Sequence, residues 1–192
     1  MRHPLFRLPA LLAVSLALTM GAAHAQTAPK FEPTVQVQNT KLLLNGSGTR
    51  YRTVIKVYEM GLYTPRKVTS AEELLALPGP KRLQFIAARE LPGTDLGRLF
   101  FKSMGDNSTK DQMTKHALSS TRLIEVFSGK SKLMPGDTFA MEFLPGKGTQ
   151  FYITGKAQGE PVGDAEFFTM VLKIWFGPSP ADNLLKDALL GG

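Results

Sequence analysis

The chain has 192 residues, with 23 lysines and arginines against 16 acidic residues, a formal net charge of +7 and no cysteine. This length fits one domain with a hydrophobic core of its own, and the absence of cysteine excludes disulfides, thiol nucleophiles and thiolate metal sites. Because the basic residues are spread along the chain, the charge pattern does not predict a nucleic-acid partner. It leaves open an anionic lipid or an anionic small ligand.

The first 25 residues have the pattern of a cleaved signal peptide. Arg2 and Arg7 supply a positive start, 8–22 is an apolar run, and Ala-His-Ala at 23–25 is a small-x-small cleavage site. The alternative is a retained membrane anchor, but Pro9 interrupts the run and the run is shorter than a bilayer span. We therefore expect a signal peptide over 1–25, one domain over 26–192, location in a bacterial periplasm and no stable membrane span.

The segment 42–63 contains the most informative residue, Arg50. β-Branched and aromatic residues dominate the second half of this segment, which predicts a partly buried strand, and Asn45, Gly46 and Gly48 predict a turn before it. A guanidinium stays charged and offers a planar fork of donors, so Arg50 in an apolar pocket would suit a carboxylate, phenolate or enolate. The alternative is an edge-strand arginine that extends to water.

The remaining chain alternates hairpin-like strands with inserted helices. This order predicts an α+β fold in which a mostly antiparallel sheet is covered by helices on one face. The large apolar residues Phe167, Phe168, Ile174 and Trp175 recur at helical spacing, which is more typical of a core than of a ligand cavity. The expected elements are helix 71–77 capped by Ser70, strand 82–89, a helix from Thr94 and Asp95 to Met104, one longer helix 108–127 capped by Ser108, hairpin strands 138–144 and 149–154, helix 167–176 and helix 181–190.

Other chemical signals are weak. His116 is the one histidine after residue 25, and we expect it on a helix surface beside Lys115, so no histidine cluster is available for a metal or a triad. Asp164 and Glu166 are interpreted as acids of a helix first turn, and Gly-Lys-Gly at 146–148 as a hairpin turn. We therefore expect neither cofactor nor metal, and the sequence does not identify a protein partner.

Four motifs in order resemble the chalcone isomerase-like proteins, in their bacterial exported branch. They are G-x-G-x-R at 46–50, K-V-Y-x-x-G-L-Y at 56–63, I-E-V-F at 124–127 followed by Pro-Gly at 135–136, and I-W-F-G-P-S-P at 174–180. The resemblance implies an open-faced β-sandwich, in which a large antiparallel sheet carries a layer of helices with a ligand cleft between sheet and helices.

The resemblance implies two functional classes, plant enzymes that cyclise a chalcone and relatives that bind fatty acids. Arg50 matches the family arginine of both classes, Tyr58 falls where the plant enzymes carry a threonine, and no tyrosine is available from Thr64 to Phe151 for the catalytic position. We therefore expect a non-catalytic protein that binds a small amphipathic anion such as a fatty acid through Arg50, Tyr58 and Tyr63. The alternatives are a chalcone-flavanone type isomerase (an intramolecular lyase) acting through Arg50, and a structural or partner-binding module without a small ligand.

Overall fold

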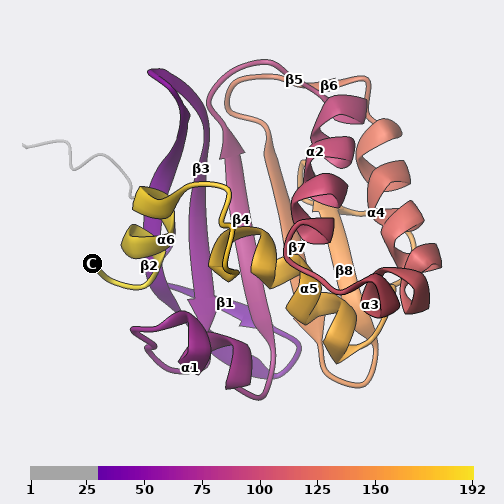
Figure 1. The fold of residues 1–192 in the computed structure, drawn as a ribbon. Helices are drawn as coiled ribbons and strands as arrows, with labels where there is room; N and C mark the ends of the chain where they lie inside the picture. Colours follow the sequence, from indigo (N-terminus) through magenta and orange to yellow (C-terminus); the bar gives the residue numbers. More distant parts are fainter. Residues whose placement is uncertain (1–29) are drawn as a thin grey trace, which may run out of the picture.

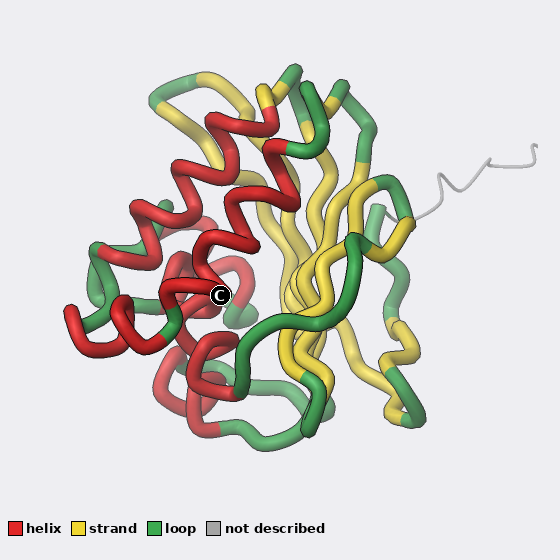
Figure 2. The backbone as a smooth tube through the Cα atoms, turned by 90° about the vertical axis from the view of Figure 1, so that its right-hand side faces the viewer, coloured by secondary structure: helices red, strands yellow, loops and turns green. Residues whose placement is uncertain are grey.

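A computed structural model describes residues 30–192 and contains one large sheet with helices on one side (Figures 1 and 2). The sheet has seven strands in the order β1-β2-β3-β4-β7-β8-β9, and a separate two-stranded sheet pairs β5 with β6. The strands are β1 (Thr34–Val37), β2 (Thr40–Arg52), β3 (Ile55–Thr64), β4 (Lys81–Ala87), β5 (Leu91–Pro92), β6 (Lys132–Leu133), β7 (Thr138–Leu144), β8 (Gly148–Ile153) and β9 (Lys156–Ala157). The helices are α1 (Ala71–Ala76), α2 (Gly93–Gly105), α3 (Lys110–Lys115), α4 (Ala117–Ser128), α5 (Ala165–Phe176) and α6 (Asn183–Leu189).

Every pair of neighbouring strands in the described chain is antiparallel. The predicted α+β class, with helices over one face of an antiparallel sheet, is therefore confirmed. The β7–β8 hairpin, the helix capped by Ser70 and the two C-terminal helices also form where the sequence predicts them, within a few residues.

The main core lies between the sheet and the helices and is rich in aromatic rings. On β4, Leu83, Phe85 and Ala87 alternate inward, as a half-buried strand requires, and Phe85 stacks on Phe139 with ring centroids 4.3 Å apart. Each such ring stabilises the fold by about 1.5–3 kcal/mol when it leaves water. The largest buried side chains of this layer are Tyr58, Phe85, Phe100, Phe127, Phe139, Phe151, Phe167, Phe168, Trp175 and Phe176.

The predicted turn at Asn45, Gly46 and Gly48 is wrong, because this segment is the middle of strand β2. The chain reverses later, at Thr53 and Val54, so Arg50 lies near the end of β2 and not at the start of a strand. The two glycines have a different role: α6 packs across them, and a Cβ at Gly46 would collide with the backbone carbonyl of Ala188. Glycine here permits a close approach of helix and strand.

Two helix starts also differ from the prediction. The expected helix 108–127 is two helices that break at His116, and Thr109 caps the first of them through a capping box in place of Ser108. The helix expected from Thr94 begins one residue earlier, at Gly93, where a Cβ would collide with the carbonyl oxygens of Phe127, in the last turn of α4, and of Lys130, just after it.

Among residues 30–192, no helix combines the length and the apolar character that a membrane crossing needs. The predicted signal peptide, 1–25, lies outside the described residues.

Candidate ligand-binding site

Arg50 and Tyr58 face each other on adjacent strands. They are register partners on β2 and β3, and directly opposed residues of an antiparallel pair project from the same face. Tyr58 is fully buried in the main core, Arg50 is half-buried, and the guanidinium carbon lies 5.6 Å from the centre of the Tyr58 ring. The structure thus brings together two of the three residues proposed to bind a ligand.

Trp175 links this pair to the helical layer. Its indole Nε1–H donates a buried hydrogen bond of 2.8 Å to the Tyr58 hydroxyl. Asp164 caps the start of α5 by accepting from the Phe167 N–H, and the helix then carries Trp175 inward over the sheet. Sequence reasoning placed Trp175 in the core but missed its partner, although a buried indole N–H requires an acceptor.

Two hydrogen-bond donors at this site have no acceptor among residues 30–192. The Nε of Arg50 is buried without a partner. The Tyr58 hydroxyl accepts from Trp175, but its own hydrogen meets no acceptor in the described part of the chain. A buried donor without a partner costs about 1–3 kcal/mol, so an oxygen that reached both donors would bind favourably.

The electrostatics of the site favour an anion. Burial raises the pKa of Tyr58, and the nearby Arg50 charge only partly opposes that increase, so the phenol stays protonated and can donate. Arg50 forms no ion pair with an acidic group in 30–192. The nearby acid Asp182 is occupied as the N-cap of α6 and as the acceptor of the Tyr51 backbone N–H, at 3.1 Å.

Tyr63, the third proposed ligand residue, lies on the other face of the sheet. It is five residues from Tyr58 on the same strand, and an odd separation reverses the face. Tyr63 packs in a smaller outer cluster with Phe31, Val37 and Leu42, and its hydroxyl donates to the Glu32 carbonyl at 3.0 Å. It therefore does not join Arg50 and Tyr58 in one site.

The cleft implied between sheet and helices is filled by aromatic side chains beside Tyr58: Phe85 and Phe139 pack edge-on against its ring. Two open cavities lie elsewhere. One of about 320 Å³ is on the outer face, lined by Lys30, Phe31, Leu44, Ser47, Gly48, Thr49 and Glu59. The other, about 570 Å³, lies among helices, lined by Glu72, Leu75, Ala76, Asn107, Lys173, Phe176, Gly177, Pro178 and Lys186. Neither includes Arg50 or Tyr58.

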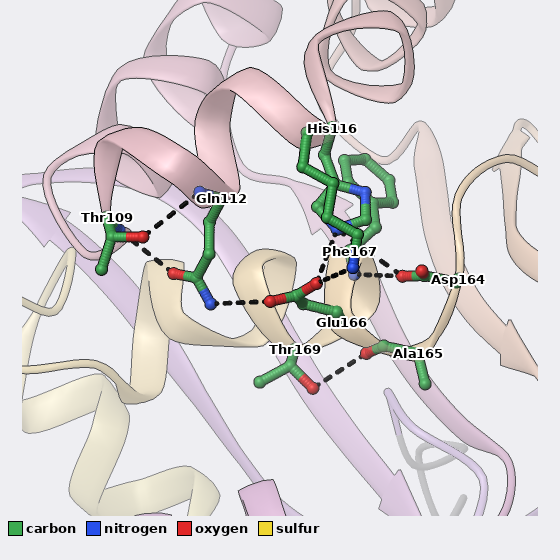
Figure 3. A network of polar contacts seen from close by, with 9 residues as sticks. Thr109, Gln112, His116, Asp164, Ala165, Glu166, Phe167 and Thr169 are labelled. Atoms are coloured by element: carbon green, nitrogen blue, oxygen red, sulfur yellow. Dashed lines mark hydrogen bonds and ion pairs between the residues drawn. The ribbon is translucent and has the colours of Figure 1, made fainter.

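His116 belongs to a second polar cluster (Figure 3). The expectation of a surface position is wrong: His116 is buried at the break between α3 and α4, with Nε2 3.2 Å from Glu166 and 3.7 Å from Asp164. Lys115 and Gln112 also bind the Glu166 carboxylate, and these bonds, led by that of Lys115, lower the pKa of Glu166 to about 2.

This cluster ties α3 and α4 to the first turn of α5. Among residues 30–192, one group of side chains has ligand atoms close enough together to share a cation: His116, Asp164 and Glu166. Sequence reasoning did not foresee this arrangement. The Lys115 ammonium already contacts the same carboxylate and neutralises it. Asp164 and Glu166 do occupy the N-cap and first turn of α5, as predicted.

Comparisons with known proteins agree with this fold. The chain matches the chalcone isomerase-like family over residues 23–191. Among solved structures, 37 chains match, including the crystal structure of a fatty-acid binding protein from Arabidopsis thaliana. That match has a TM-score of 0.68 and 16% sequence identity, and it covers 83% of this chain and 90% of the Arabidopsis chain. The comparison with curated proteins found no match.

Proposed function

We propose, from the premise that the chain belongs to the chalcone isomerase-like family, that it is a non-catalytic binding protein of the bacterial exported branch. Its ligand is a small amphipathic anion such as a fatty acid. Arg50 pairs with the anionic head group, and the Tyr58 hydroxyl donates to it.

The observation that carries the proposal is the pair of unused donors, the Arg50 Nε–H and the Tyr58 O–H, on adjacent strands. A carboxylate has two oxygens with several lone pairs and can accept from both donors. Its negative charge would also compensate a guanidinium that lacks an ion pair in 30–192, and charge-assisted hydrogen bonds are about twice as strong as neutral ones.

The ligand tail would need space within the aromatic layer. Since Phe85, Phe139 and Trp175 occupy the volume around Tyr58, a tail that entered there would displace the Trp175 ring and lengthen its bond to Tyr58. The Arabidopsis protein that shares the fold is described as a fatty-acid binding protein, which supports an aliphatic tail.

Trp175 is the single tryptophan and therefore reports directly on this site. Titration with dodecanoate should change its fluorescence, and the change should saturate. Arg50→Ala should weaken binding by about 2–5 kcal/mol, because the carboxylate would be buried without a partner. Arg50→Lys should recover part of the affinity, since an ammonium lacks the planar fork.

Tyr63→Phe is the matched control, because it removes a buried tyrosine hydroxyl from the same strand but from the opposite face. Its dodecanoate affinity should equal that of the wild type. Equal affinities for wild type, Arg50→Ala and Arg50→Lys would refute the anion site.

The absence of catalysis is tested separately. No tyrosine occurs from Thr64 to Phe151, and α2 and α4 direct Phe100 and Phe127 toward the sheet, where they cannot act as acids or bases. We expect no cyclisation of a chalcone above the uncatalysed rate, measured by loss of chalcone absorbance. Cyclisation that disappears in Arg50→Ala would instead establish an isomerase.

Export is part of the proposal and is supported by the positive start, the apolar run and the small residues at 23–25. Intact-mass measurement of protein from the periplasmic fraction should find Gln26, or its pyroglutamate form, at the N-terminus. A full-length product in the cytoplasm would contradict export.

A further inference from the structure

The turn that joins β2 to β3 carries apolar side chains in water. Val54 is 83% exposed, Ile55 50% and Tyr51 44%. Figure 1 shows this tip at one end of the sheet, beyond α6. We call the segment from Tyr51 to Lys56 the hairpin tip.

Positive charges flank these apolar residues. Arg52 and Lys56 are exposed in the hairpin tip, and neither forms an ion pair with any acid in 30–192. Arg89 is also exposed and lies at the same end of the sheet, because β4 ends at Ala87 where β3 begins. The acid beside it, Glu90, pairs with Lys132.

Folding alone does not favour these residues in the turn. Thr53 has a φ of +58°, a conformation that suits glycine or asparagine and strains a β-branched side chain. The neighbour Val54 is β-branched and buries almost nothing. The turn therefore retains apolar, β-branched residues at some expense of stability.

We propose that the hairpin tip docks on an anionic lipid bilayer. Val54 and Ile55 enter the boundary between head groups and acyl chains, while Arg52 and Lys56 contact the anionic head groups. A protein partner fits less well, because a stable protein interface needs about 800 Å² on each side and the tip is a single narrow turn. This inference does not depend on an anion bound at Arg50.

Vesicle flotation tests the inference. Each variant is expressed as the full chain, and only preparations with the same N-terminus by intact mass are compared, because the apolar run at 8–22 would itself partition into lipid. Vesicles of phosphatidylcholine with about one-third phosphatidylglycerol should bind the protein, and pure phosphatidylcholine should bind it more weakly. Added salt should reduce binding to the anionic vesicles.

Two double variants separate the apolar contribution to vesicle binding from the electrostatic one. Val54→Ser with Ile55→Ser should reduce the partition coefficient at least about tenfold, because two exposed apolar side chains no longer enter the interface. Arg52→Gln with Lys56→Gln should reduce it about fivefold per charge on anionic vesicles, and hardly at all on neutral ones.

Matched controls are available on other surfaces. Leu118→Ser removes a side chain that is 88% exposed on α4, and Lys41→Gln with Lys147→Gln removes two exposed lysines from the opposite end of the sheet. Both should bind vesicles like the wild type. Absence of wild-type binding, equal losses in controls and tip variants, or a dimer in sedimentation that Val54→Ser with Ile55→Ser dissociates would each overturn the proposal.

Discussion

Strand β3 presents one tyrosine to each face of the sheet, and the two tyrosines have different environments. Tyr58 lies under the helices, accepts from the Trp175 indole and faces a cation, Arg50. Tyr63 lies on the outer face, where its hydroxyl donates to the backbone of Glu32. Both are almost completely buried, so burial alone does not separate a candidate binding residue from a structural one.

The two tyrosines differ in chemistry because different parts of the chain pack against the two faces of the sheet. The inner face meets helices that bring side chains from more than 100 positions away, as in the Tyr58–Trp175 pair, which are 117 residues apart. On the outer face, the Tyr63 hydroxyl meets the chain that precedes it, 31 residues away at Glu32. The two donors proposed to bind a ligand, on Arg50 and Tyr58, lie on the inner face.

The largest expected difference between the faces is in packing. Trp175→Ala should lower the free energy of unfolding by about 4–5 kcal/mol, because it opens a large cavity inside the aromatic layer. Leu42→Ala, in the outer cluster, should lower it by about 2–3 kcal/mol. Urea denaturation measures both values, and equal losses would break the distinction between a main core and a subsidiary one.

The hydroxyls of Tyr58 and Tyr63 allow a second comparison of the two faces, with an expected effect of intermediate size on stability. Tyr58→Phe leaves the buried Trp175 N–H without an acceptor, so it should cost about 2 kcal/mol. Tyr63→Phe frees a carbonyl of the exposed residue Glu32, which water can reach, and should cost about 0.5 kcal/mol. Thermal unfolding of both variants under one buffer condition checks the order, and the reverse order would contradict it.

The smallest effect concerns pH. Lys81 lies at the edge of the inner face, and burial lowers the pKa of its ammonium from 10.5 to about 8. Below pH 8 the folded and unfolded states both hold the proton. Between about pH 8 and 10.5 the unfolded chain still holds the proton that the folded protein has released, so the free energy of unfolding rises with pH.

The free energy of unfolding should rise by about 1.5 kcal/mol, roughly half the unscreened value, because the Leu77 and Gly79 carbonyls accept from the ammonium and offset part of its desolvation. Urea denaturation across this pH range measures it. Lys81→Met should abolish the rise, whereas substitution of Arg82, which projects from the outer face and pairs with Glu142, should leave it in place. If the free energy of unfolding still rises with pH in Lys81→Met, the rise comes from another titratable group.

Local signals predicted much of the fold and only part of the site. The Ser70 cap, the β7–β8 hairpin and the apolar period of α5 depend on neighbouring residues, so the sequence contains their cause. Gly46 and Gly48 were misinterpreted as a turn because the reason for them, α6, lies about 140 residues away. The break at His116 similarly depends on contacts with the first turn of α5.

The candidate site likewise combines features that the sequence predicts with features that depend on distant parts of the chain. Arg50 and Tyr58 were grouped through the family resemblance, and the structure places them opposite each other on consecutive strands. The group also included Tyr63, which strand alternation places on the other face. Trp175 could not be assigned to Tyr58, because no local pattern encodes a contact between a strand and a helix so far along the chain.

The glycines of β2 also govern when the fold can be completed. Asn45 donates to the carbonyl of Leu189, 144 residues later, and α6 packs on Gly46 and Gly48 beside it. During synthesis, therefore, strand β2 is made well before α6, the helix that covers its surface. Contacts of such long sequence separation form late and slow folding, so this part of the fold stays incomplete until α6 is available.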